Sequence, residues 1–344
     1  MNAPVTPTKP DPSHFASRET VRWCPGCGDY AILKGIQRAL AERARPREDT
    51  VFVSGIGCSS RLPYYLSTYG FHTIHGRAPA VATGIKMANP GLDVWVITGD
   101  GDGLSIGGNH MLHALRRDID FNILLFNNEI YGLTKGQLSP TSRLGTRSPT
   151  SLKGSVERPV SAVRFALGAG ARFVARALDV QQDRLPEILV RAAGHRGAAF
   201  VELLQNCSVY NDGAFAFLTD RETGAEKRLH VRHGEPLRYG ADGEFGLRLD
   251  ARTMKLEAVK VGSGGCSEEE ILIHDERNPA LAGLLATIGP PAFPVPLGVI
   301  YCNPEALAED DAVAGVTKAE PPAIRTTDAD LTAMLASEGT YQLT

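Results

Sequence analysis

Two apolar runs of the sequence end on side chains that carry oxygen. The run from Val94 to Thr98 stops at a Gly-Asp-Gly turn around Asp100, and the run from Ile123 to Phe126 stops at an asparagine pair that ends at Asn128. Helical spacing between the runs predicts two parallel strands joined by a crossover helix. Because open α/β sheets bind ligands at the carboxyl ends of their strands, Asp100 and Asn128 should lie side by side in such a site. A carboxylate, an amide oxygen and nearby backbone carbonyls are the ligands that Mg²⁺ prefers.

A pair of cysteines could do a second kind of chemistry. Cys24 and Cys27 frame a Pro-Gly turn before a segment with helical spacing that starts at Asp29, a candidate N-cap. The pair fits a thioredoxin-type dithiol, although no strand precedes it. It also fits half of a zinc site, although the chain has no second Cys-x-x-Cys and no His-x-x-x-His. The third interpretation is a [4Fe-4S] cluster, which needs two more cysteines.

Two of the other four cysteines lie where they could complete a cluster. Cys58 follows the predicted strand from Thr50 to Ser54, and Cys207 follows the predicted strand from Ala199 to Leu204. Both loops should face the same edge of the sheet as the predicted magnesium site, so four thiolates could converge near a bound ligand. The remaining two cysteines match no motif of this type, and a free cysteine usually packs as a small hydrophobic residue.

The predicted magnesium site resembles that of the thiamine diphosphate (ThDP) enzymes. Their Mg²⁺ and diphosphate motif is a Gly-Asp-Gly turn followed, 28 residues after its Asp, by the second residue of an asparagine pair. The longer string NNEIYGLTKGQLSPTS is similar, almost residue for residue, to the β subunit of the 2-oxoacid:ferredoxin oxidoreductases. The resemblance implies that Asp100 and Asn128 hold Mg²⁺, with the backbone carbonyl of Ile130 as a third ligand.

The same resemblance implies the rest of a cofactor site. The iron-sulfur-bearing β subunits carry WCPGCG, GIGC and a late cysteine, which assigns a [4Fe-4S] cluster to Cys24, Cys27, Cys58 and Cys207. His75 lies in an HGR loop that feeds the positive end of a predicted helix, although a lone histidine is often only part of a core. The cofactor-binding residues implied in this way are Ile56, Gly57, Cys58, Ser59, His75, Gly76, Gly101, Asp102, Gly132 and Leu133.

The resemblance also implies an activity that needs a second subunit. The reaction would be the oxidative decarboxylation of a 2-oxoacid, 2-oxoglutarate in the most similar branch, with coenzyme A, giving acyl-CoA and CO₂. ThDP serves such enzymes as an electron sink, and the [4Fe-4S] cluster would pass the electrons to ferredoxin or another low-potential acceptor. A glutamate that activates the aminopyrimidine of ThDP would come from an α subunit, because this sequence holds only one α/β sheet. An (αβ)₂ assembly is expected.

Arg61 and Leu133 are expected to border the reacting carbon of the substrate. Arg61 lies three residues after Cys58, at a place where relatives carry a cation, and Leu133 ends the YGL segment after the magnesium ligands. A guanidinium can hold a substrate carboxylate through two parallel hydrogen bonds. The simpler alternative is that Arg61 pairs with an acidic residue on the surface.

Composition narrows the class of protein. The 344 residues are 43% hydrophobic and 22% charged, the balance of an ordinary globular chain. A net charge of −3 offers no basic surface for nucleic acid or an anionic membrane. The N-terminus lacks the order of a signal peptide, and prolines interrupt the longest uncharged stretch, so no membrane span is expected. Six cysteines without a sign of secretion favour reduced thiols and a cytoplasmic location.

The predicted fold class is α/β: a parallel sheet of five or six strands with helices on both faces, in the diphosphate-binding module of the ThDP-binding fold. We expect an N-terminal arm over residues 1–20, the ThDP and magnesium domain with the [4Fe-4S] site over 21–218, and a β-rich or mixed C-terminal extension over 219–344. Within the extension, a strand is predicted from Ile271 to His274, and a polar tail is expected to be mobile or bound to a partner.

A long loop from Ser139 to Pro159 is rich in Ser, Thr, Gly and Pro. Loops of this length inside compact domains usually have a function. It could cover the active site or receive an anionic tail such as that of coenzyme A, and a merely solvated loop is an equal alternative. Its cationic side chains are Arg143, Arg147, Lys153 and Arg158.

Two other functions fit parts of the pattern. One is the diphosphate-binding subunit of a ThDP decarboxylase or carboligase without electron transfer, which would lack the brown colour of an iron-sulfur protein. The other is a metal-stapled interaction protein, which would catalyse nothing with any partner.

Overall fold

The computed structural model describes residues 10–262, 264–304 and 333, and residues 10–304 lie in one compact unit. Residues 1–9 of the expected N-terminal arm and nearly all of the expected polar tail lie outside the described residues. None of the helices in the described part is long and apolar enough to cross a membrane.

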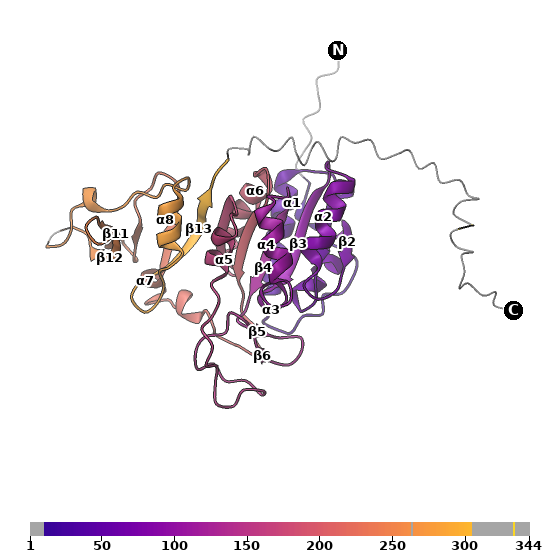
Figure 1. Ribbon diagram of the computed structural model, residues 1–344, viewed down its shortest axis with the longest axis horizontal. Coiled ribbons are helices and arrows are strands. Elements are labelled where there is room, and N and C mark those ends of the chain that lie inside the picture. The colour runs from indigo at the N-terminus through magenta and orange to yellow at the C-terminus, as the bar shows by residue number, and fades with distance from the viewer. Residues whose placement is uncertain (1–9, 263, 305–332, 334–344) are drawn as a thin grey trace, which may run out of the picture. The chain divides into compact units, whose positions relative to one another are not determined.

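An eight-stranded sheet runs through the unit in the order β2-β1-β3-β4-β8-β7-β13-β9 (Figure 1). The first six strands are parallel, whereas β13 is antiparallel to β7 and parallel to β9. The predicted parallel sheet of five or six strands is thus confirmed, and two strands from the C-terminal extension enlarge it. The strands are β1 (Thr50–Ser54), β2 (Tyr69–His72), β3 (Asp93–Gly99), β4 (Asn122–Asn127), β7 (Phe173–Leu178), β8 (Ala199–Leu204), β9 (Arg228–Val231) and β13 (Val295–Cys302).

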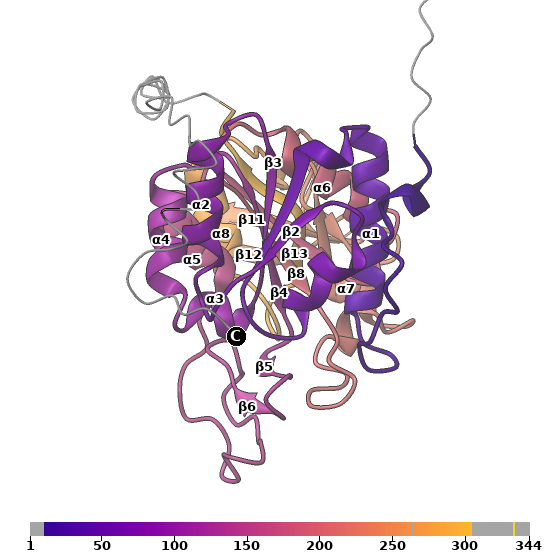
Figure 2. The same ribbon diagram turned by 90° about the vertical axis from the view of Figure 1, so that its right-hand side faces the viewer.

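Helices cover both faces of the sheet, as predicted. Alternate residues of each strand point to opposite faces, so Val94 and Val96 pack into one apolar layer while Trp95 and Ile97 pack into the other. One face carries α2 (Ala78–Ala88), α4 (Gly108–Arg116) and α5 (Ala162–Gly168), and the opposite face carries α1 (Asp29–Arg43) and α6 (Leu185–Gly194) (Figure 2).

The crossover between β3 and β4 is broken into two helices, not one. The short α3 (Asp100–Leu104) is followed by Ser105, whose backbone is not helical. The second helix, α4, begins three residues after Ser105. The Gly107 N–H donates to the Asp102 carbonyl (3.0 Å), and a Cβ at Gly107 would lie 2.6 Å from that oxygen. This tight turn brings the backbone at Gly107 against Gly76, so the HGR loop packs on the start of the crossover.

Asp29 was expected to cap α1, and that expectation is wrong. Gly28 is the N-cap, and Asp29 is the first residue of the helix, with a buried side chain. A Cβ at residue 28 would lie 2.0 Å from Asp179 Oδ2, so only glycine fits there. Burial raises the pKa of Asp29 to about 7.

Beyond residue 219 the chain is mixed, as predicted, but one strand is absent. Residues Ile271–His274 do not form a regular strand. Leu272 forms backbone hydrogen bonds with Leu237 and Leu247, and the His274 N–H donates to the Glu235 carbonyl. The segment has one isolated β-bridge, from Ile273 to Pro236. The division at residue 219 stays a prediction, and β9 and β13 from beyond it belong to the central sheet. The other elements here are α7 (Gly224–Lys227), α8 (Pro279–Leu285), and a three-stranded sheet of β10 (Arg238–Tyr239), β11 (Phe245–Asp250) and β12 (Lys255–Lys260).

Candidate functional site

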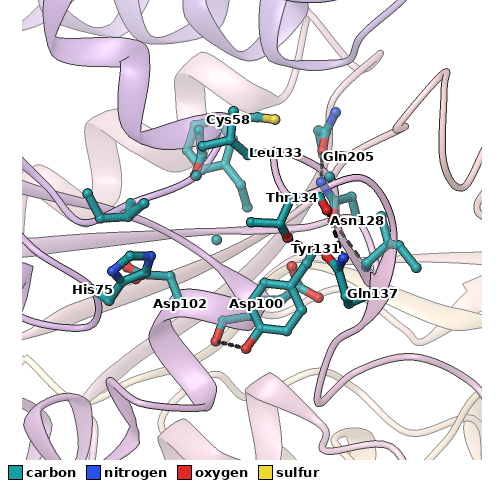
Figure 3. Close-up of a pocket in the computed structure, with 18 residues that line it drawn as sticks. Cys58, His75, Asp100, Asp102, Asn128, Tyr131, Leu133, Thr134, Gln137 and Gln205 are labelled. Carbon is teal, nitrogen blue, oxygen red and sulfur yellow. Dashed lines mark hydrogen bonds between the residues drawn. The ribbon is translucent and has the colours of Figure 1, made fainter. Parts of the chain in front are cut away.

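A cavity of about 400 Å³ opens at the carboxyl ends of the parallel strands, a size usual for cofactor sites (Figure 3). Its walls come from the loops that follow β1, β3, β4 and β8 and from the HGR loop before α2. Of the residues predicted for ThDP, Mg²⁺ and substrate, those that line it are Ile56, Gly57, Cys58, Ser59, His75, Asp100, Gly101, Asp102, Asn128, Ile130, Gly132 and Leu133. Gly76 and Arg61 do not line it.

Asp100 is a buried acidic residue of this cavity. Its Oδ2 accepts hydrogen bonds from Ser139 Oγ (2.6 Å) and Thr141 Oγ1 (2.5 Å), and burial raises the pKa of the carboxyl to about 6. Within residues 10–262 and 264–304, no Lys, Arg or His forms an ion pair with it. A buried carboxylate without a cationic neighbour suits a bound metal ion.

Asn128 follows β4 and lines the same cavity as Asp100. Its Nδ2 donates to Gln205 Oε1 (2.9 Å), and its Oδ1 accepts from the Ile130 N–H (3.2 Å). The chain turns between Asn128 and Ile130 because Glu129 adopts a left-handed backbone, with φ of +58°. Asp100 and Asn128 therefore bring a carboxylate and an amide to one cavity, and their oxygens are of the kind that Mg²⁺ prefers.

The start of the long loop supports this turn. Ser142 Oγ donates to the Glu129 carbonyl (2.6 Å), and Arg143 pairs with the Glu129 carboxylate (2.8 Å). The Arg143 guanidinium also lies over the rings of Phe215 and Phe217, so it ties the turn to the segment after Cys207. Residues 139–143 thus hold the candidate metal ligands, while Arg147, Lys153 and Arg158 further along the loop are exposed.

Asp102 joins three loops of the cavity wall. Its Oδ1 accepts from the Gly76 N–H (2.8 Å) and its Oδ2 from Thr98 Oγ1 (2.9 Å). A Cβ at Gly55 would lie 2.0 Å from Oδ2, which explains the glycine before Ile56. Gly76 therefore reaches the site through Asp102, and His75 beside it lines the cavity.

Gly101 is required for a reason that the sequence did not reveal. Tyr131 lies against it and donates from Oη to the Gly101 carbonyl (2.9 Å). A Cβ at residue 101 would lie 2.3 Å from Tyr131 Cε1, so the ring occupies the space of the missing side chain.

We therefore expect Gly101→Ala to displace Tyr131 and to lower the free energy of unfolding by about 1 to 3 kcal/mol, the usual cost of overpacking. Gly84→Ala in α2 is the matched control, because nothing lies within 4 Å of its added Cβ. Alanine should stabilise that exposed helical position by about 0.5 to 1 kcal/mol. Thermal unfolding of both variants measures the change in stability. A melting temperature of Gly101→Ala that is no lower than that of the parent would contradict the role given to Tyr131.

Four cysteines lie in loops close to one another, beside this cavity. A Cβ at Gly132 would lie 3.5 Å from Cys58 Sγ and 3.6 Å from Cys207 Sγ, so glycine leaves room beside both sulfurs. The Cys24–Cys27 turn packs on the Cys207 loop, where Ser208 Oγ donates to the Pro25 carbonyl (2.8 Å). Cys58 is the one that also lines the cavity.

The pKa values of two of these thiols are raised, mainly by burial. Burial, with smaller contributions from Asp29 and from other cysteines, raises the pKa of Cys58 to about 12 and also raises that of Cys27. As free thiols these two would stay protonated, so a metal centre must displace their protons when it binds. Among the described residues, no three His, Cys, Asp or Glu side chains are grouped as ligands of a single metal ion.

Arg61 lies one turn after Cys58, in a 3₁₀ helix over Ser59–Tyr65. Its Nε donates to the Tyr65 hydroxyl (3.0 Å), and within the described ranges Arg61 forms no ion pair with an acidic residue. Leu133 lines the cavity and is 52% exposed, so it stands at the opening.

Sequence reasoning missed several residues of the cavity wall. Tyr131, Thr134 and Gln137 lie inside the string NNEIYGLTKGQ, so the motif itself could have marked them. Phe126 ends an apolar strand and carries no chemical signal, and neither does Gln205, which follows β8. The missed residues are Phe126, Tyr131, Thr134, Gln137 and Gln205.

The part of the chain that forms most of the cavity wall matches a known protein family. The family model described as "Thiamine pyrophosphate enzyme, C-terminal TPP binding domain" matches residues 55–203. That range contains the residues predicted for ThDP and Mg²⁺, whereas Cys24, Cys27 and Cys207 lie outside it.

Three relatives extend the likeness over most of the chain. It is 53% identical over 288 residues to 2-oxoglutarate oxidoreductase subunit KorB of Mycobacterium tuberculosis, covering 83% of this chain and 76% of that one. It is 48% identical to 2-oxoacid:ferredoxin oxidoreductase 1, subunit beta, of Aeropyrum pernix, covering 55% of this chain and 60% of that one. A solved structure of 2-oxoglutarate:ferredoxin oxidoreductase from Magnetococcus marinus, with 2-oxoglutarate, coenzyme A and succinyl-CoA bound, matches with a TM-score of 0.73 and 32% identity. That match covers 94% of this chain and 95% of that chain.

Proposed function

Because the chain belongs to the β subunits of the 2-oxoacid:ferredoxin oxidoreductases, we propose that it catalyses, with an α subunit, the oxidative decarboxylation of 2-oxoglutarate to an acyl-CoA. One observation carries the proposal: Cys58 lines the cavity that contains Asp100, and its thiol is close enough to the other three cysteines to interact with them electrostatically. A cofactor bound in the cavity and a cluster bound by the cysteines would then be neighbours.

The residues that would hold ThDP and Mg²⁺ are those of the cavity wall. Asp100, Asn128 and the Ile130 carbonyl would bind the ion, which in turn would bind the diphosphate. ThDP, when bound, supplies an electron sink for breaking the bond between the keto carbon and the carboxylate. The loops at Ile56–Ser59, at His75 and at Gly132–Leu133 would enclose the rest of the cofactor, and Asp102 would hold the first two of these loops together.

The cysteines would hold a [4Fe-4S] cluster as the electron acceptor. They lie in three separate loops, and their four sulfurs would have to converge on one cluster. In the overall reaction one carbon–carbon bond breaks to release CO₂ and one thioester bond forms to coenzyme A. Two electrons and one proton are left, and the electrons would pass through the cluster, one at a time, to ferredoxin or a similar low-potential acceptor.

The α subunit would complete the site. ThDP needs a glutamate near its aminopyrimidine, but the acidic residues that line the cavity in the described part of the chain are Asp100 and Asp102. The missing glutamate would come from the partner, across the open side of the cavity, in an (αβ)₂ assembly.

A cytoplasmic location of the complex is part of the same proposal.

The test is co-expression of this chain with an α subunit of the same family. We expect a brown complex that reduces a viologen dye only when 2-oxoglutarate and coenzyme A are both present, with acyl-CoA as product. A colourless complex that releases CO₂ without reducing the dye would favour a non-oxidative ThDP decarboxylase instead.

Arg61 is proposed to hold a substrate carboxylate, with Tyr65 fixing its side chain. Arg61→Ala should lower kcat/KM by a factor that corresponds to a loss of about 2 to 4 kcal/mol in transition-state stabilisation. This loss is comparable to that of one partner from a buried charged pair. If Arg61 binds the distal carboxylate, the loss should be larger for 2-oxoglutarate than for pyruvate. Steady-state kinetics with both acids measure this.

Arg38→Ala, on the exposed side of α1, is the matched control and should behave as the parent. If kcat/KM of Arg61→Ala stays within about threefold of the parent for both acids, a difference under ~0.7 kcal/mol, Arg61 does not act in the site.

A further inference from the structure

Gln205 lies between the two halves of the site. It follows β8, is 1% exposed and lines the cavity next to Asn128 (Figure 3). On its other side it reaches Cys27, which is remote in sequence. One uncharged side chain thus contacts a candidate magnesium ligand and a candidate cluster ligand.

A directed chain of hydrogen bonds fixes how the Gln205 amide is oriented. The backbone N–H of Ile130 can only donate, so the Asn128 oxygen accepts from it (3.2 Å) and Asn128 Nδ2 must face Gln205. Gln205 Oε1 accepts from that Nδ2 (2.9 Å). Gln205 Nε2 is left to donate to Cys27 Sγ (3.3 Å) and to the Asn206 carbonyl (2.5 Å).

The backbone around Gln205 is held as firmly as its side chain. The Gln205 N–H donates to the Asn127 carbonyl (2.9 Å), which extends the β4–β8 ladder to the cavity. The next residue, Asn206, donates from its N–H to Asp179 Oδ2 (2.9 Å) and accepts from the Gly28 N–H (3.0 Å). These bonds fix the backbone on both sides of the Gln205 side chain.

We propose that Gln205 is a positioning residue that serves both groups, an inference that rests on the proposed ligand roles of Asn128 and Cys27. By holding the Asn128 amide nitrogen, it turns the amide oxygen toward the metal, as outer-shell partners of metal ligands do. By donating to the Cys27 sulfur, it stabilises the added negative charge of a reduced cluster. Hydrogen bonds to cluster sulfurs are one of the factors that set the reduction potential, so this one raises it.

The experiment uses the αβ complex with Gln205→Met, which keeps the length of the side chain but removes both the donor and the acceptor. Two quantities are measured: the midpoint potential of the cluster, by EPR-monitored redox titration, and the Kd of ThDP in the presence of Mg²⁺, by calorimetry. We expect a more negative potential and a Kd about 10 to 100 times weaker. Gln37→Met is the matched control, because Gln37 lies two turns beyond Asp29 along α1, about 12 Å away, and should change neither quantity.

Gln205→Asn provides a second test if the methionine variant loses its cluster. Its amide is one methylene shorter and cannot reach Asn128 and Cys27 together, so at least one quantity should change. The proposal is overturned if Gln205→Asn matches the parent in both quantities, or if Gln205→Met changes only one of them or neither. A parent complex without iron and acid-labile sulfide would instead overturn the proposed function.

Discussion

Asp100→Asn should weaken the binding of ThDP in the presence of Mg²⁺ by at least about 100-fold, or about 2.8 kcal/mol. Asp100 is the one carboxylate among the proposed magnesium ligands, and Mg²⁺ is a hard cation that binds through carboxylates. Asparagine is the better substitution than alanine, because its carbonyl oxygen can still accept from Ser139 and Thr141. The fold should therefore survive, and the lost affinity can be assigned to the lost charge. Calorimetric titration of the complex with ThDP measures it.

Asp93→Asn is the matched control for this experiment. Asp93 is also buried, and it begins the strand whose other end leads into Asp100, about 20 Å away. Its carboxylate lies 3.4 Å from Arg43, so the variant should lose stability but keep the parent's affinity for ThDP. If Asp100→Asn binds ThDP as tightly as Asp93→Asn does, Asp100 is not a magnesium ligand.

Cys58→Ala should remove most of the iron from the complex, and so should alanine at the other three proposed ligands. A [4Fe-4S] cluster held by three protein ligands loses one iron–thiolate bond and opens one corner to solvent. Iron and acid-labile sulfide, measured per complex, report the loss, and circular dichroism shows whether the fold is kept.

Two cysteines outside the site are the controls. Cys302 packs at the end of β13 in the apolar layer beneath α1 and α6, and Cys266 lies near Arg248 in the extension. Alanine at either position should leave the iron content unchanged. Equal iron loss from Cys302→Ala and Cys58→Ala would refute the ligand assignment.

Strand ends were the part of the site that could be predicted from the sequence. Asp100 and Asn128 were expected to meet because β3 and β4 are parallel neighbours, and they do line one cavity. The same reasoning placed the loops with Cys58 and Cys207 at that edge, and both sulfurs lie beside Gly132. A continuous apolar run followed by a polar loop carries enough information for this, since a parallel strand with both faces buried has such a run.

Contacts between side chains of different loops could not be predicted. The ring of Tyr131 fills the space over Gly101, and Gln205 reaches from β8 to Cys27, but no spacing rule joins residues so far apart in the sequence. Asp29 was wrongly expected to cap α1 because the packing of Asp179 against Gly28 is also a long-range contact. The break between α3 and α4 likewise depends on the HGR loop, which lies well before it in the chain.

If electrons from a 2-oxoacid reach a cluster held by this chain, EPR spectroscopy detects them directly. The complex is purified without oxygen, with its cluster oxidised, and frozen after mixing with 2-oxoglutarate and coenzyme A. We predict the signal of a reduced [4Fe-4S] cluster in the parent, and its absence from Asp100→Asn, in which dithionite should still produce it. A parent complex that releases CO₂ from 2-oxoglutarate while its cluster stays oxidised would contradict the proposed function.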